Sequence, residues 1–161
     1  QLKTPSASTA SEVEQTVGLT EIEVEYNRPS KRGRDIFGNL VPFGKLWRTG
    51  ANSGTEISFS TDVSINGENI KEGTYSIFSI PNKDSWSIIL YSDTDLWSVP
   101  RNWDESKVVF KSEFATNDYN GHTVETFTIS FDDITNNDAN LVFSWDDTYV
   151  EVPVELSLIH I

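Results

Sequence analysis

The segment Glu21-Ile22-Glu23-Val24-Glu25-Tyr26 alternates acidic and apolar side chains. Successive side chains of an extended chain point to opposite faces of a sheet. This stretch therefore predicts a strand with one buried face and one acidic, solvent-exposed face. The same alternation recurs along the chain, and tight-turn sequences such as Asn66-Gly67 separate the runs. Because no window of helical length carries an apolar stripe, we predict an all-β protein.

The alternating runs predict about nine strands, at a spacing that is typical of a sandwich or a barrel. Their core positions lie in 22–26, 57–59, 63–65, 74–80, 86–90, 108–110, 127–131, 141–145 and 150–154. In 74–80 both faces carry apolar side chains, which predicts a central strand covered on both sides. A short helical turn is expected within 97–107. The predicted architecture is a single-domain antiparallel β-sandwich over 11–155, preceded by an N-terminal arm at 1–10.

Composition narrows the possible functions. The formal charge of −13 argues against nucleic-acid binding, which needs basic surface to replace counterions. The chain has no cysteine, so thiol nucleophiles, disulfides and thiolate metal sites are excluded. No apolar run approaches the roughly 20 residues of a membrane span, so membrane insertion is not expected. We expect no cofactor, and protein partners stay open.

Both ends of the sequence carry an expectation. The chain begins with Gln1 rather than Met, which favours a removed secretory signal and a secreted or periplasmic protein. Residues 156–161 continue the last strand without a turn signal and match what a common transposase adapter encodes. We therefore interpret 156–161 as a non-native scar on a truncated chain, with Leu156 also fitting the parity of the strand.

The segment 28–48 concentrates positive charge in an acidic chain. It holds six of the 12 basic residues against one acid, Asp35, which gives a local charge of +5. Four of these bases are arginines, whose planar guanidinium favours two-pronged recognition of carboxylate or phosphate. Regularly spaced glycines and large apolar side chains accompany them. We therefore predict one long ordered loop, rich in Arg and Gly, rather than a disordered linker.

Three functions remain open for this loop. The first is a binding module for a small anionic or sugar-like ligand, with candidate contacts at Arg28, Arg34, Trp47, Arg48, Asn52 and Tyr75. The second is a hydrolase or lyase in which Glu56 or Asp35 acts as a base. The third is a structural or protein-interaction domain in which the arginines form an internal salt-bridge clasp. Enzymatic activity is the less favoured of these.

Other candidate sites carry weaker signals. His122 is the only histidine before residue 156, so a multi-histidine metal site is excluded. Turn acids could supply oxygen ligands to calcium, but none matches an EF-hand loop, and we predict no metal site. Trp97 and Trp103 lie in a polar connection and are candidates for stacking against a sugar. Trp86 alternates with core positions and is expected to pack inside.

Three stretches resemble the signature of a known bacterial family. They are Tyr26-Asn27-Arg28-Pro29, Gly33-Arg34-Asp35-Ile36-Phe37-Gly38, and the run from Leu40 to Asn52, LVPFGKLWRTGAN. Together with the runs at 73–78 and 125–129 they resemble domain of unknown function 2911 over roughly residues 5–154. The resemblance implies a secreted or periplasmic β domain. It implies no activity.

Overall fold

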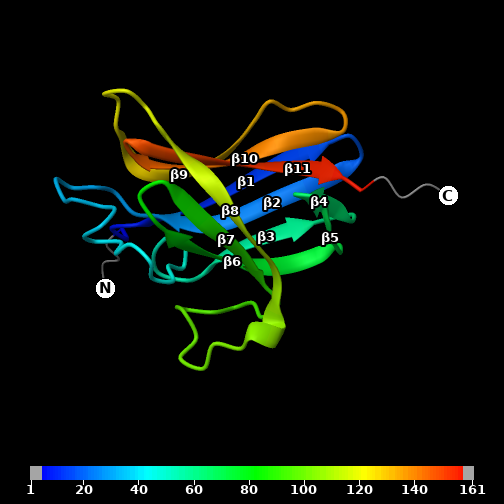
Figure 1. Cartoon of the computed structure of the whole chain (residues 1–161), viewed down its shortest axis with the longest axis horizontal. Helices are drawn as coiled ribbons and strands as arrows, with labels where there is room; N and C mark the ends of the chain where they lie inside the picture. Colours follow the sequence, from blue (N-terminus) through cyan, green and yellow to red (C-terminus); the bar gives the residue numbers. More distant parts are fainter. Residues whose placement is uncertain (1–4, 158–161) are drawn as a thin grey trace.

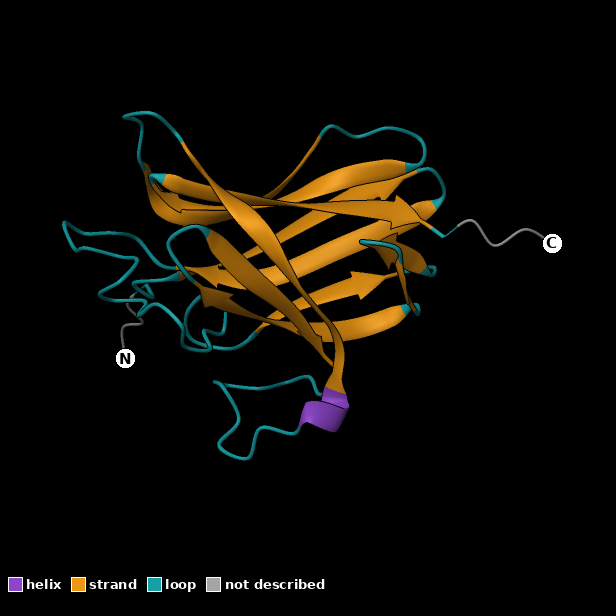
Figure 2. Ribbon diagram, in the orientation of Figure 1, coloured by secondary structure: helices purple, strands orange, loops and turns teal. Residues whose placement is uncertain are grey.

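The protein is described by a computed structural model that covers residues 5–157. Nearly all regular structure is strand, as Figures 1 and 2 show. The strands are β1 (Thr9–Val17), β2 (Thr20–Arg28), β3 (Thr55–Phe59), β4 (Val63–Ile65), β5 (Glu68–Ile70), β6 (Gly73–Pro81), β7 (Ser85–Tyr91), β8 (Val108–Asp118), β9 (Val124–Asp132), β10 (Asp138–Asp146) and β11 (Thr148–Leu156). A single 3-10 turn, η1 (Glu105–Lys107), lies within the segment predicted to hold a short helical turn.

The strands form one antiparallel sheet that curls until it is nearly closed. Its order is β1-β2-β3-β6-β7-β8-β11-β10-β9, with β4 and β5 attached beside β11. The last strand of this path, β9, returns to lie against β1 and β2 (Figure 1). The all-β prediction is confirmed, but the two-sheet sandwich is not. Alternation specifies a buried face, and a curled sheet satisfies it as well as two packed sheets do.

Two strands escaped the sequence prediction. Thr9–Val17 forms β1, so the expected N-terminal arm gives way to a strand at Thr9 rather than after Ala10. In β1 only Val13 and Val17 place apolar side chains toward the core, because polar residues fill the other positions. The second, β5, is a three-residue strand that pairs with β4. β1 has too few apolar residues at its core-facing positions to show the alternation, and β5 has a single buried residue, Ile70.

The core lies inside the curled sheet and is lined by alternate residues of nearly every strand. In β2, Ile22, Val24 and Tyr26 are buried, as the alternation predicted. The double-sided burial predicted for 74–80 is also confirmed. Ile77 on β6 packs in the main core, whereas Phe78 packs on the opposite face with Ile89, Tyr91 and the loop that precedes η1. Trp86 is buried in the main core.

Side chains of β2 bridge the seam where the sheet nearly closes. The buried Tyr26 hydroxyl accepts a hydrogen bond from the backbone N–H of Ile129 at 3.0 Å. Arg28 Nε donates to the carbonyl of Phe127 at 3.0 Å, and its Nη2 donates to Thr128 Oγ1 at 2.9 Å. These bonds satisfy polar groups of β9 that a neighbouring strand would otherwise pair. Between β2 and β9 the seam is therefore held by side chains, and one backbone bridge, between Ser30 and Thr126, follows directly after β2.

None of the helical structure in residues 5–157 is long and apolar enough to cross a membrane.

The seam generates a test of stability. Tyr26→Phe removes the hydroxyl that the buried N–H of Ile129 bonds, and we expect the free energy of unfolding to fall by about 1–2 kcal/mol. Urea denaturation followed by circular dichroism measures the change. Tyr149→Phe is the matched control, because the Tyr149 hydroxyl makes no hydrogen bond within residues 5–157 and the ring is only half-buried. Equal stabilities for the two variants would contradict the role given to Tyr26.

Candidate ligand-binding site

Residues 29–54 connect β2 to β3 and are fastened to two separate strands of the barrel. Near its start, the N–H of Lys31 donates to the carbonyl of Glu125 at 2.8 Å, which attaches the loop to β9. Further on, Trp47 and Ser79 of β6 exchange backbone hydrogen bonds of 2.8 and 3.0 Å. The buried Thr49 hydroxyl also bonds Ser79 Oγ at 2.8 Å. Backbone pairing at both ends gives the loop a fixed position over one end of the barrel.

Trp47 inserts between the aromatic side chains at this end of the core. Its ring stacks on that of Trp145, with centroids 6.0 Å apart and planes 15° apart, and meets Phe127 and Phe37 edge-on. The indole N–H is occupied by a hydrogen bond of 3.2 Å to the carbonyl of Gly50. Trp47 therefore contributes an apolar surface and no free donor.

Gly50 permits the close approach of this loop to β2 and β3. Its φ is +154°, and a Cβ at this position would lie 3.0 Å from both the carbonyl oxygen of Asn27 and Oγ1 of Thr55. A larger residue would force these oxygens away. The glycine therefore allows the loop to descend onto the barrel directly after Thr49.

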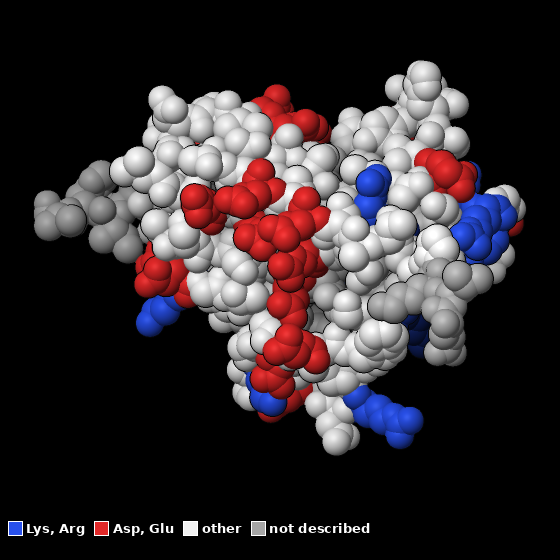
Figure 3. All heavy atoms as spheres, turned by 180° about the vertical axis from the view of Figure 1, so that it is seen from behind, with Lys and Arg blue, Asp and Glu red and all other residues white. Residues whose placement is uncertain are grey.

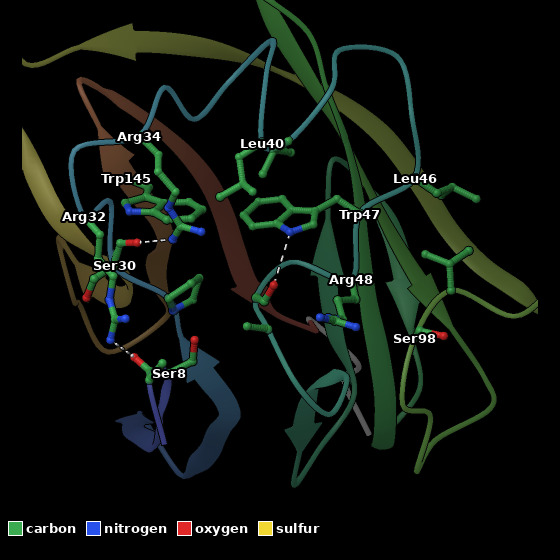
Figure 4. Close-up of a pocket in the computed structure, with 16 residues that line it drawn as sticks. Ser8, Ser30, Arg32, Arg34, Leu40, Leu46, Trp47, Arg48, Ser98 and Trp145 are labelled. Carbon is green, nitrogen blue, oxygen red and sulfur yellow. Dashed lines mark hydrogen bonds between the residues drawn. The ribbon is translucent and has the colours of Figure 1, made fainter. Parts of the chain in front are cut away.

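A hollow of about 540 Å³ opens between this loop and its surroundings. Four parts of the chain line it: the residues before β1, the 29–54 loop, the connection after β7, and β10. The lining residues are Ala7, Ser8, Pro29, Ser30, Arg32, Arg34, Leu40, Val41, Leu46, Trp47, Arg48, Gly50, Ala51, Ser98, Val99 and Trp145. Three are arginines and none is acidic. Figure 4 shows Trp47 and Leu40 in the middle, with Arg32 and Arg34 to one side and Arg48 to the other.

The lining arginines are held by neutral oxygen atoms. Arg34 donates to the carbonyls of Lys31 and Ser30 at 2.9 and 2.6 Å. Arg48 Nη1 lies 3.4 Å from the carbonyl of Trp97, and Arg32 Nη2 lies 3.4 Å from that of Ala7. Since a guanidinium has five N–H groups, each arginine keeps at least three for another acceptor. A carbonyl orients a guanidinium without cancelling its charge.

Ion pairs play a small part in this region. Within residues 5–157 none of the arginines pairs with a carboxylate, and the loop's one ion pair joins Lys31 to Asp146 of β10 at 2.7 Å. That bond raises the pKa of Lys31, because the hydrogen bond to Asp146 favours the charged amine. The alternative of an internal salt-bridge clasp of arginines therefore has no ion pair to support it within residues 5–157, where the loop's ion pair is made by Lys31.

The structure brings together three of the six predicted ligand contacts. Arg34, Trp47 and Arg48 line the hollow. Arg28 is directed instead to β9, as described for the seam. Asn52 holds the N-terminal arm through a bond of 3.3 Å to the carbonyl of Ser8. Tyr75 is buried on β6, where its hydroxyl donates to the carbonyl of Lys71 at 2.6 Å and burial raises its pKa.

The two candidate catalytic acids lie outside the lining. Asp35 is exposed on the 29–54 loop. Glu56 lies on β3 and borders a separate hollow, where its carboxylate accepts a hydrogen bond of 2.8 Å from the N–H of Asp95. Among residues 5–157, the arginines are the only titratable side chains in the lining of the first hollow. That lining therefore supplies positive charge and hydroxyls, and no general base.

Several lining residues could not be selected from the sequence. Arg32 belongs to the basic segment 28–48, and the high positive charge of that segment was the one available signal for it. In the sequence, Trp145 alternates with its neighbours like an ordinary core residue, and in the structure it is indeed buried on β10. Ser98 and Val99 follow β7 in a polar connection, and Ala7 and Ser8 precede β1. Only the folding of distant segments onto one end of the barrel gives these residues a common surface.

The two tryptophans considered for stacking against a sugar, Trp97 and Trp103, have different environments in the structure. Trp103 stacks on Tyr91, with ring centroids 4.3 Å apart, and packs in the smaller apolar cluster around Phe78. Trp97 is 68% exposed, and its backbone carbonyl faces Arg48.

Acidic side chains gather in a band on one face of the molecule (Figure 3). On β1 and β2, carboxylate oxygens of Glu12, Glu23 and Glu25 lie within 4.8 Å of one another, the one such grouping of potential metal ligands in residues 5–157. The pKa of Glu23 is raised by desolvation and then by the charge of Glu12. Among the turn acids weighed for calcium, Asp93 and Asp146 instead pair with lysines.

These features define an all-β, barrel-like domain with an arginine-lined hollow at one end. The chain belongs to the family described as protein of unknown function (DUF2911), which matches residues 8–154. No curated protein and no solved structure matches the chain. The resemblance recognised in the loop signature is thereby confirmed.

The crowded carboxylates generate a pH-dependent prediction. A raised pKa means that the folded protein holds the Glu23 proton more tightly than the unfolded chain does, so the ionised form costs stability as the pH rises. Glu23→Gln should therefore raise Tm at pH 7, and the gain should vanish below the ordinary pKa of 4.5. Thermal unfolding across this range measures it.

Glu113→Gln is the matched control for Glu23→Gln. Glu113 is exposed on β8 and faces Ser87 rather than an acid across the sheet. A gain that appears equally in Glu113→Gln, or that persists in acid, would contradict the assignment to Glu23.

Proposed function

We propose that this domain binds a small anionic ligand in the arginine-lined hollow. The observation that carries the proposal is the composition of its lining: three arginines and no acid, in a chain of net charge −13. Within residues 5–157 their guanidiniums pair with no carboxylate, and the Glu125 carboxylate bonds the Arg32 backbone N–H instead. Here they meet backbone carbonyls and retain unused donors, which is an arrangement suited to carboxylate or phosphate oxygens.

The dimensions and the walls of the hollow support the same conclusion. Small-molecule sites are concave, mostly apolar, and carry a few fixed polar groups. A volume of about 540 Å³ falls in the range of such sites. Trp47 and Leu40 supply apolar wall over the buried Trp145 and Val41, while the arginines and Ser30 supply donors. Since two backbone carbonyls orient Arg34 before a ligand arrives, little of its side-chain entropy is lost on binding.

An anion fits this lining better than a neutral sugar. Sugar hydroxyls are usually recognised by side chains that both donate and accept, such as carboxylates and amides. The lining has three serine hydroxyls and neither of those groups. The unused hydrogen-bonding capacity is therefore mainly donor capacity, which calls for a ligand rich in acceptors.

Ligand screening tests the proposal. We expect phosphate, sulfate or simple organic carboxylates to raise Tm at low ionic strength, and the effect to weaken with added salt. Arg32→Gln and Arg34→Gln should each weaken binding about tenfold, because a hydrogen bond to a charged group contributes roughly 1.5–3 kcal/mol. Calorimetric titration of an anion found in the screen measures the loss.

Arg101→Gln is the control for these variants. Arg101 is exposed and does not line the hollow, so its substitution removes the same charge elsewhere. If the pocket variants bind anions as Arg101→Gln does, the site is not where we place it. If Arg34→Gln lowers Tm but leaves the response to anions unchanged, the arginines have a structural role instead.

A further inference from the structure

We infer that the ligand carries two anionic groups joined by an apolar spacer, an inference that rests on the proposed function. Figure 4 shows why the three arginines do not converge on one point: Arg32 and Arg34 lie on one side of the Trp47 ring and Arg48 lies on the other. A single carboxylate or phosphate placed between the two sides would contact the ring rather than a guanidinium. Two separate anionic groups would each meet donors.

The separation of the two sides is set by the barrel. Arg32 and Arg34 follow Ser30, whose hydroxyl is 3.0 Å from that of Thr126 on β9. Arg48 follows Trp47, which pairs through its backbone with Ser79 on β6. In the order of the sheet, β6 and β9 are not neighbours. Each arginine group is thus tied to a different part of the wall, and the loop cannot bring them together by a local change.

The surface between the two sides is apolar. It is formed by Trp47 and Leu40, with Val41 and Trp145 also in the lining. The Trp47 N–H already bonds the carbonyl of Gly50, so the ring offers the ligand no donor. Hydroxyls or amides laid on this surface would lose water without gaining a partner. A hydrocarbon or aromatic spacer would instead bury apolar area.

The two ends of the hollow differ in positive charge. Arg32 and Arg34 together bring two guanidinium groups to one end, and Arg48 brings one to the other. A ligand with one anionic group should therefore bind at the first end, and a second anionic group should add the Arg48 contact. This assigns the ligand class: alkane or aryl dicarboxylates and bisphosphonates of a length that matches the spacing.

The experiment compares ligands that carry two anionic groups, called dianions below, with ligands of the same length that carry one, called monoanions. Calorimetric titrations at constant ionic strength would use the α,ω-alkane dicarboxylates from succinate to sebacate, their ω-monoamides, and the alkane bisphosphonates with their monophosphonates. At the matching length, we expect the dianion to bind about tenfold or more tightly than its monoanionic partner, because the second charged contact is realised only there.

Variants at Arg48 locate the second contact. Arg48→Gln should reduce the affinity of the dianion to that of the monoanion while changing the affinity of the monoanion by less than about twofold. Arg48→Lys should retain most of the preference for dianions, since it keeps the charge, and Arg101→Gln should retain all of it. The same thermal unfolding transition in each variant verifies that the fold is preserved.

The possible failures are distinguishable. If anions bind but no dianion exceeds its partner, or if the preference is independent of length, the two-ended ligand is overturned and the proposed function stands. If Arg48→Gln weakens monoanions and dianions equally, the arginines act on one anionic group, and the inference is likewise overturned. If no anion of any kind binds the wild-type protein, both the inference and the proposed function fail.

Discussion

Backbone hydrogen bonds tie the 29–54 loop to β9 at Lys31 and to β6 at Trp47, and the geometry around the arginine-lined hollow depends on this double attachment. A loop fixed at one end would sample many positions, and its charged side chains would turn toward the many carboxylates of the surface. Both ends of the loop are fixed, and Trp47 is inserted among the core rings. The carbonyl of Lys31 in the loop and that of Trp97 in the connection after β7 therefore lie where the guanidiniums of Arg34 and Arg48 can bond them. The aromatic packing of Trp47 and the orientation of the arginines therefore both follow from the double attachment of the loop.

The distribution of charge follows from the same arrangement. Acidic residues lie on the outward positions of strands such as β2, where water solvates them and like charges crowd. The loop separates three arginines from these acids and lines a hollow with them. At about 0.1 M salt, charges farther apart than roughly 10 Å are largely screened. An anion therefore experiences the net negative charge weakly at a distance and the guanidiniums strongly on contact.

Particular residues show how much of the fold and of the candidate site could be predicted from the sequence. The alternation at Ile22, Val24 and Tyr26 and the two-sided burial of β6 were predictable, because the pleat of a strand converts sequence parity directly into burial. β1 was not predictable, since its core-facing positions are mostly polar. Of the residues predicted as ligand contacts, Arg34, Trp47 and Arg48 line one hollow. Arg28 and Tyr75 do not, because their parity places them on strands whose partners in the fold, β9 and the Lys71 turn, the sequence does not specify.

By itself the sequence determined the all-β class, the positions of nine of the eleven strands, most core residues and the family signature in the loop. These properties are local: they depend on the parity of side chains, on turn residues, and on charge counted along the chain. Only the tertiary structure decided that the sheet curls into a nearly closed barrel rather than separating into two layers. It also decided that residues before β1, after β7 and within β10 complete the hollow. The physical reason is that strand pairing across long sequence distances places these segments together, and no local pattern records which strand will pair with which.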